Sequence, residues 1–180
     1  GLVYRTADGE LRQNEVALEI DLDGIRRPDY EGIGLEDYIR RGYRFNTPYH
    51  RNAPIWVTRG CPYRCGFCSA PMQNGRVVRR HSIGYVTEWI QDLYHRAGIR
   101  KINIIDDNFT FDPQYAKEVC HAIIDLRLKD LRMGTPNGIR VQRTDSELLG
   151  LMRRAGWESI SIAPESGSRR TLARICLLYT

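Results

Sequence analysis

A regular alternation of short apolar segments with helical segments, beginning at Pro54, most constrains the fold of this chain. Residues 55–58 and 101–105 are short, apolar and rich in β-branched side chains, as buried strands are. The segment between them carries apolar residues at helical spacing. Further strands are predicted within 131–140 and at 159–163, and helices over 83–97, from Asp112-Pro113, from Thr144, which with Glu147 is spaced as a capping box, and from Gly167.

Strands that alternate with helices are expected to run parallel, with the helices packed outside the sheet. The sequence therefore predicts an α/β fold, either an open sheet or a barrel. Ligands of such folds collect at the C-terminal ends of the strands. The residues that follow the predicted strands are polar or metal-binding: Cys61 to Cys68, Asp106-Asp107-Asn108, Arg140 and Glu165-Ser166.

Three cysteines form a C-x3-C-x2-C motif directly after the first of these strands, at Cys61, Cys65 and Cys68. Three thiolates on one loop can hold a [4Fe–4S] cluster and leave one iron open for an outside ligand. The alternative is a zinc site with His81 or His50 as the fourth ligand. Zinc ribbons usually pair two C-x2-C knuckles, and the sequence has no second one.

The composition suits one ordered domain, with 180 residues of which 42% are hydrophobic and 27% charged. No apolar run approaches the roughly 18 residues of a membrane span, and the N-terminus lacks a signal-peptide pattern. A cytoplasmic location is therefore expected, where thiols stay reduced. The net charge of +5 is too small to favour nucleic acid as a partner.

Residues 1–53 are expected to form an extended linker, because turn residues interrupt them and they lack the apolar residues for a core of their own. Short strands are predicted near residues 2–4 and 15–20, followed by a helical turn over 35–41.

The run Cys61-Pro62-Tyr63-Arg64-Cys65-Gly66-Phe67-Cys68, placed straight after a strand, resembles the radical S-adenosylmethionine (SAM) superfamily. The resemblance implies that Cys61, Cys65 and Cys68 bind a [4Fe–4S] cluster whose fourth iron is chelated by the amino and carboxylate groups of SAM. It further implies that reduction of the cluster cleaves SAM to a 5′-deoxyadenosyl radical, which abstracts a substrate hydrogen. Phe67 matches the aromatic residue that commonly lies near the adenine in this family.

The run 104–110, Ile-Ile-Asp-Asp-Asn-Phe-Thr, resembles the second strand and its exit loop in the cobalamin-binding subgroup of this superfamily. There, Asp106 or Asp107 would hold the SAM ammonium by a charge-assisted hydrogen bond. The alternative is that these acidic residues simply make a turn and cap a helix.

The run 163–168 resembles the exit of the fourth strand in the same subgroup. Glu165 and Ser166 would then face the SAM ribose or carboxylate. The alternative is an ordinary strand–turn–helix junction with Ser166 or Ser168 as the N-cap. For Arg140, contact with a carboxylate and plain solvation are both open.

The resemblance implies a partial (β/α) TIM-like barrel of the radical SAM type, with residues 54–175 as the N-terminal part of the core, truncated after about four β/α units. Residues 1–53 resemble the linker that follows the cobalamin-binding domain of BchE-like enzymes. Cobalamin is therefore implied only through a domain upstream of residue 1. Residues 176–180 depart from the family pattern and are predicted to be a non-native tail.

The expected function is radical generation at a [4Fe–4S] cluster with bound SAM, for methylation or oxidative cyclisation of a small molecule at an unactivated carbon. A reductant such as flavodoxin or ferredoxin would supply the electron, and a fragment of the core is expected to be inactive alone. The alternatives are a methylthiotransferase-like radical SAM enzyme and a non-catalytic Fe–S or zinc protein.

Overall fold

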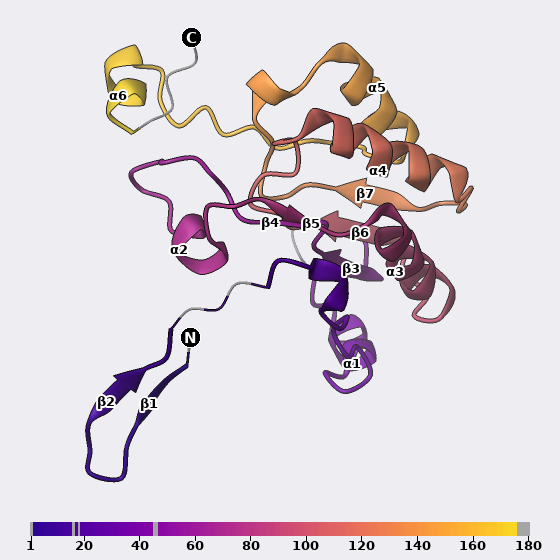
Figure 1. Ribbon diagram of the computed structural model, residues 1–180. Coiled ribbons are helices and arrows are strands. Elements are labelled where there is room, and N and C mark those ends of the chain that lie inside the picture. The colour runs from indigo at the N-terminus through magenta and orange to yellow at the C-terminus, as the bar shows by residue number, and fades with distance from the viewer. Residues whose placement is uncertain (1, 16, 18, 45–46, 176–180) are drawn as a thin grey trace.

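A parallel three-stranded sheet forms the centre of the computed structural model, which describes residues 2–15, 17, 19–44 and 47–175 (Figure 1). Its strands lie in the order β3 (Asn52–Ile55), β6 (Lys101–Ile104) and β7 (Arg132–Gly134). Asn52 is in register with Lys101, and Lys101 with Arg132. The expected parallel α/β arrangement is therefore confirmed.

Three helices cover one face of this sheet (Figure 1), namely α3 (Ile83–His95), α4 (Pro113–Asp125) and α5 (Ser146–Arg154). Alternate strand residues point towards these helices, because successive side chains of a strand leave on opposite faces. The resulting core joins strand residues Ala53, Ile55, Ile102, Ile104 and Met133 to helix residues Val86, Trp89, Ile90, Val119, Cys120, Leu148 and Met152.

Each of the three helices begins at a polar residue whose side chain accepts a hydrogen bond from a backbone N–H of the first turn. The prediction at Asp112 is confirmed. The predicted start at Thr144 is one residue early, because Asp145 accepts from the Leu148 amide while the Thr144 hydroxyl donates to the Val141 carbonyl. A short 3-10 helix, η2 (Val141–Arg143), precedes this cap.

The strand predicted at 159–163 is not formed. After α5 the chain meets β7 in a single parallel bridge, Met133 to Trp157, and Ile139 then donates its amide to the Ser161 carbonyl. A strand needs a partner along its length, and β7 is only three residues long. The chain continues extended to α6 (Arg169–Arg174); the residues of the predicted tail, 176–180, lie outside the described part.

The N-terminal part begins with a hairpin of β1 (Val3–Arg5) and β2 (Leu11–Gln13), which lies away from the sheet in Figure 1. Of the strand predicted at 15–20, residues 15, 17, 19 and 20 are not in a strand, while residues 16 and 18 lie outside the described part. A 3-10 helix, η1 (Leu22–Gly24), and the expected helical turn, α1 (Leu35–Arg40), follow.

Residues 19–41 have no core of their own, as expected, but they pack on the main core. The Leu22 side chain is buried, and Tyr30, Leu35 and Ile39 lie against the core cluster. Trp89 of α3 donates its indole N–H to the Tyr30 hydroxyl at 3.1 Å. No helix within the described residues is long and apolar enough to span a membrane.

Candidate functional site

The cysteine loop occupies the C-terminal side of β3, between two short strands, β4 (Thr58–Arg59) and β5 (Arg79–Arg80), that pair antiparallel. A helix, α2 (Ala70–Asn74), ends the loop, and the Cys61 amide donates to the Gly75 carbonyl at 3.1 Å. Gly60 has a φ of +101°, and a Cβ there would overlap the Val77 carbonyl oxygen. The base of the loop is therefore closed by backbone contacts that only glycine permits.

The three loop cysteines lie close together in the sequence and differ in exposure. Cys61 and Cys65 are half-buried and Cys68 is exposed. Burial raises the pKa of the Cys61 thiol, and the nearby Asp107, Cys65 and Cys68 raise it further. Three cysteine thiols on one loop are the donor set that a [4Fe–4S] cluster takes, so the chemistry of these residues fits the group that the motif implies.

The histidines considered for a zinc site have other partners. His81 is buried, its ring contacts Asp23 through Nδ1 at 3.0 Å, and it stacks on Tyr85 with ring centroids 4.2 Å apart. His50 lies beside the Arg44 guanidinium. Among the described residues, no set of three or more His, Cys, Asp or Glu side chains forms a ready-made ion site.

Tyr63 anchors the cysteine loop to the rim of the sheet. Its ring meets Phe111 edge-on at 6.1 Å and carries the Arg140 guanidinium at 3.8 Å. The Arg143 Nε donates to the Tyr63 hydroxyl at 3.3 Å. The sequence left two roles open for Arg140, contact with a carboxylate and solvation. The structure adds a further one, stacking of its guanidinium on an aromatic residue of the loop.

Asp106 lies in the interior, below the cysteine loop. Its side chain is 2% exposed and accepts hydrogen bonds from the Val57 amide at 2.9 Å, the Thr58 amide at 2.9 Å and the Thr58 hydroxyl at 2.7 Å. Burial raises the pKa of Asp106 to about 7, against the lowering effect of these hydrogen bonds. Both carboxylate oxygens thus accept hydrogen bonds that join the end of β6 to Val57 and Thr58, which lead into the cysteine loop.

Asp107, the next residue, is half-buried at the same rim. Its Oδ2 accepts from the Gly60 amide at 3.3 Å and from the Asn74 side-chain amide at 3.0 Å. These two donors flank the cysteine loop, since Gly60 precedes Cys61 and Asn74 ends α2. The structure brings Asp107, rather than Asp106, together with the cysteines.

The other predicted site residues are accessible. Phe67, between Cys65 and Cys68, is 57% exposed. Glu165 is exposed and adopts a left-handed φ of +60°, which is uncommon for a residue with a side chain. Ser166 is half-buried and accepts from the Ser168 amide, while Ser168 caps α6. A hydrogen bond from the Gly66 amide to the Ile175 carbonyl, at 3.4 Å, links the end of α6 to the cysteine loop.

Sequence reasoning missed several residues that shape this rim, namely Thr58, Tyr63, Asn74 and Arg79. Each acts through a partner far away in the chain, so no local motif reveals it. The one available signal was position: Tyr63 lies inside the cysteine motif and Asn74 directly precedes a glycine that ends the loop.

Comparison with known proteins agrees with this geometry. The family model described as the radical SAM superfamily matches residues 55–178. Cytidylyl-2-hydroxyethylphosphonate methyltransferase from Streptomyces wedmorensis is 32% identical over 159 residues, which cover 86% of this chain and 29% of that protein. Anaerobic magnesium-protoporphyrin IX monomethyl ester cyclase from Synechocystis sp. is 26% identical over 175 residues, covering 97% of this chain and 33% of that protein.

Solved structures of radical SAM enzymes share the fold. The cobalamin-dependent SAM radical enzyme OxsB aligns with a TM-score of 0.69 at 20% identity, covering 100% of this chain and 26% of that one. The radical SAM methyltransferase TsrM from Kitasatospora setae aligns with a TM-score of 0.57 at 24% identity, covering 68% of this chain and 22% of that one. The chain spans about a third or less of the relatives it matches.

Radical SAM proteins are enzymes that use a [4Fe–4S] cluster and SAM, and the fold expected from the cysteine motif is confirmed. Because the family model matches more than half of its residues, the chain belongs to the radical SAM superfamily.

Proposed function

We propose that Cys61, Cys65 and Cys68 hold a [4Fe–4S] cluster whose open iron binds SAM. The observation that carries this proposal is the closed loop with three cysteine thiols at the C-terminal side of β3. When bound, the reduced cluster would supply the electron that cleaves SAM, and the 5′-deoxyadenosyl radical so formed would abstract hydrogen from an unactivated carbon. The residues of this chain bind, orient and shield that pair.

Asp107 is the residue we assign to the SAM ammonium. Asp107 is half-buried near Cys61, and among the described residues its hydrogen bonds, from Gly60 and Asn74, both go to Oδ2, which leaves Oδ1 for a further donor. A carboxylate that faces an ammonium forms a charge-assisted hydrogen bond, stronger than a neutral one. Asp106 supports this arrangement from below, through Val57 and Thr58.

Three further residues are proposed to line the SAM site. Phe67 offers an exposed ring between two ligand cysteines, suited to contact with the adenine. Glu165 and Ser166 offer polar groups for the ribose or carboxylate of SAM. The left-handed backbone at Glu165 supports a functional role, because such strain tends to persist at ligand sites.

The relatives favour methylation or oxidative cyclisation of a small molecule as the overall reaction, since they include a methyltransferase and a cyclase. Cobalamin is proposed as a further cofactor, supported by the fold shared with the cobalamin-dependent enzyme OxsB. We place the enzyme in the cytoplasm, with flavodoxin or ferredoxin as the source of the electron.

Anaerobic reconstitution with iron and sulfide tests the cluster assignment. The wild-type chain is expected to bind about four irons and four sulfides, the composition of the cluster. Cys61→Ala, Cys65→Ala and Cys68→Ala should each lose most of this iron. Cys120→Ala is the matched control, because Cys120 is fully buried in α4 and its thiol pKa is raised to about 12 by burial.

Iron content that is equal in the loop variants and in Cys120→Ala would contradict the proposal. So would a wild-type chain that takes up zinc and excludes iron under the same conditions.

A further inference from the structure

Arg79 of β5 joins two parts of the chain that lie far apart in the sequence. Its side chain belongs to a residue that is only 7% exposed. Nη1 donates to the Glu19 carbonyl at 2.6 Å, and Nη2 donates to the Asn74 carbonyl at 2.6 Å. One guanidinium thus ties the N-terminal segment to the end of α2.

The partners of Arg79 make this an unusual use of a buried cation. Burying a charge is costly unless it is paired or hydrogen-bonded. In the described part of the chain, the ion pairs do not include Arg79, and the two bonds that hold it go to neutral backbone carbonyls. The planar fork of arginine suits it to bridging two such acceptors at once.

Asn74 carries the contact onward to the cysteine loop. While its carbonyl accepts from Arg79, its side-chain amide donates to Asp107 Oδ2 at 3.0 Å. The same oxygen accepts from the Gly60 amide. The next residues complete the loop base, since Gly75 accepts from the amide of Cys61. Arg79 therefore acts on the residues that flank the first cysteine.

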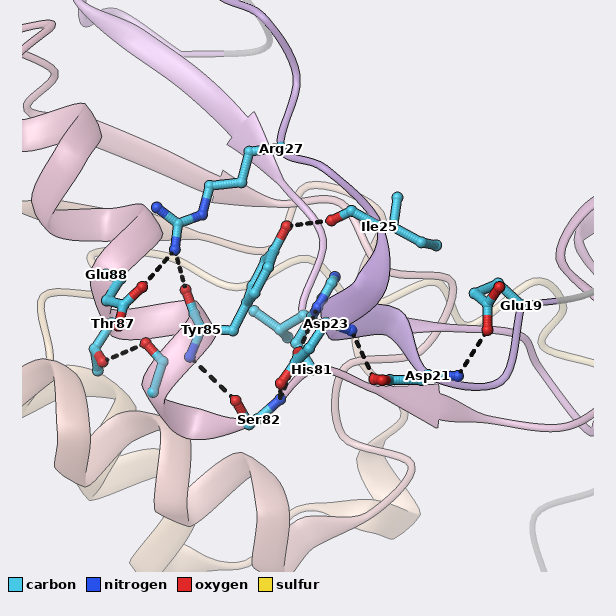
Figure 2. Close-up of polar contacts among 12 residues, drawn as sticks. Glu19, Asp21, Asp23, Ile25, Arg27, His81, Ser82, Tyr85, Thr87 and Glu88 are labelled. Atoms are coloured by element: carbon cyan, nitrogen blue, oxygen red, sulfur yellow. Dashed lines mark hydrogen bonds and ion pairs between the residues drawn. The ribbon is translucent and has the colours of Figure 1, made fainter.

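The segment that reaches Arg79 is itself fixed against α3. Figure 2 shows Asp23 contacting His81 and the Ser82 amide, and the Tyr85 hydroxyl donating to the Ile25 carbonyl at 2.7 Å. Arg27 extends the attachment by pairing with Glu88 at 3.0 Å. Residues 19–27, which we name the strap, therefore have a defined position relative to the loop.

We propose that Arg79 is a positioning residue that holds the base of the cysteine loop in register with the strap, so that the position of the strap sets the geometry of the SAM site. The proposal deepens the proposed function and rests on it for the identity of the ligand. Its mechanical part, a link from the strap through Arg79 to the loop, concerns this chain alone.

Hydrogen exchange of the full chain without iron or SAM tests the link directly. Arg79→Met is expected to raise amide exchange in residues 60–75 about tenfold or more, because it removes two charge-assisted hydrogen bonds. Exchange in α4, the internal reference, should stay unchanged. Arg80→Met is the matched control: Arg80 is the neighbouring residue, is exposed, and contacts Asp112 and Tyr115 instead.

A double-mutant cycle then tests transmission from the strap. Asp21 caps η1 by accepting from the Asp23 amide at 3.1 Å. Asp21→Ala should loosen the strap and raise exchange in residues 60–75 about threefold. In the Arg79→Met background the same change should add nothing further. Additive effects would overturn the proposal, as would Arg79→Met behaving like Arg80→Met or raising exchange equally in α4.

Reconstituted protein separates this inference from the proposed function. Arg79→Met should keep the iron content of the wild type but bind SAM about tenfold more weakly, seen as a higher SAM concentration needed to change the cluster spectrum. Unchanged SAM binding in Arg79→Met would overturn the claim that the strap sets the SAM site. A wild-type cluster that ignores SAM would instead contradict the proposed function and leave the exchange result standing.

Discussion

At the scale of single residues, the two neighbouring aspartates show what a sequence can and cannot reveal. Their position after a strand indicated that this rim binds a ligand, and both are found there. Which one lies beside the cysteine loop depends on donors from another part of the chain: the Val57 and Thr58 amides draw Asp106 inward. Those donors lie nearly fifty residues earlier, so no local pattern predicts the choice.

Asp106 is expected to make the stability of the fold depend on pH. Its pKa is about 7 in the folded chain and 3.8 in an ordinary setting, so between these values the folded chain holds a proton that the unfolded chain releases. The contribution to the unfolding free energy is therefore fully present below about pH 4 and is lost as the pH rises through 7.

Urea unfolding of the wild type and Asp106→Asn at pH 5 and pH 8 measures this contribution. The unfolding free energy of the wild type should fall relative to that of the variant by about 2 kcal/mol across this range. Effects of other titrating groups largely cancel in the difference. Parallel pH profiles for the two proteins would show that Asp106 does not titrate near neutrality.

At the scale of elements, local signals predicted helices well and strands less well. The Asp112-Pro113 start of α4 is fixed by residues within one turn, and the structure confirms it. The strand expected at 159–163 failed because pairing depends on a neighbour, and β7 offers only the bridge from Met133 to Trp157. The error at Thr144 is of another kind, since Thr144 and Asp145 are both good caps and only tertiary contacts select between them.

The N-terminal segment 19–41 shows the same dependence on distant contacts. Tyr30→Phe is expected to lower the unfolding free energy by about 1–3 kcal/mol, because the buried indole N–H of Trp89 loses its acceptor and the Pro54 carbonyl loses a donor. Tyr38→Phe is the control, since Tyr38 is 52% exposed. Urea unfolding decides the matter, and equal losses in the two variants would mean that residues 19–41 do not stabilise the core.

At the scale of the whole molecule, the strand–helix rhythm and the cysteine motif were enough to predict the parallel α/β fold and the radical SAM family. The contacts that organise the rim were not predictable, because they join the loop to β6, to η2 and to the strap across long stretches of chain. Tyr63 illustrates this, since its ring and hydroxyl contact Phe111, Arg140 and Arg143, which all follow it by more than forty residues.

The central claim is that the three-cysteine loop presents an open iron to SAM beside Asp107. Electron paramagnetic resonance of the reduced, reconstituted chain, recorded with and without SAM, tests it most directly. The cluster signal is expected to change on addition of SAM. Asp107→Asn should need about tenfold more SAM than the wild type for the same change, whereas the control Asp125→Asn should need the same concentration as the wild type. A reduced cluster whose signal is the same with and without saturating SAM would contradict the account.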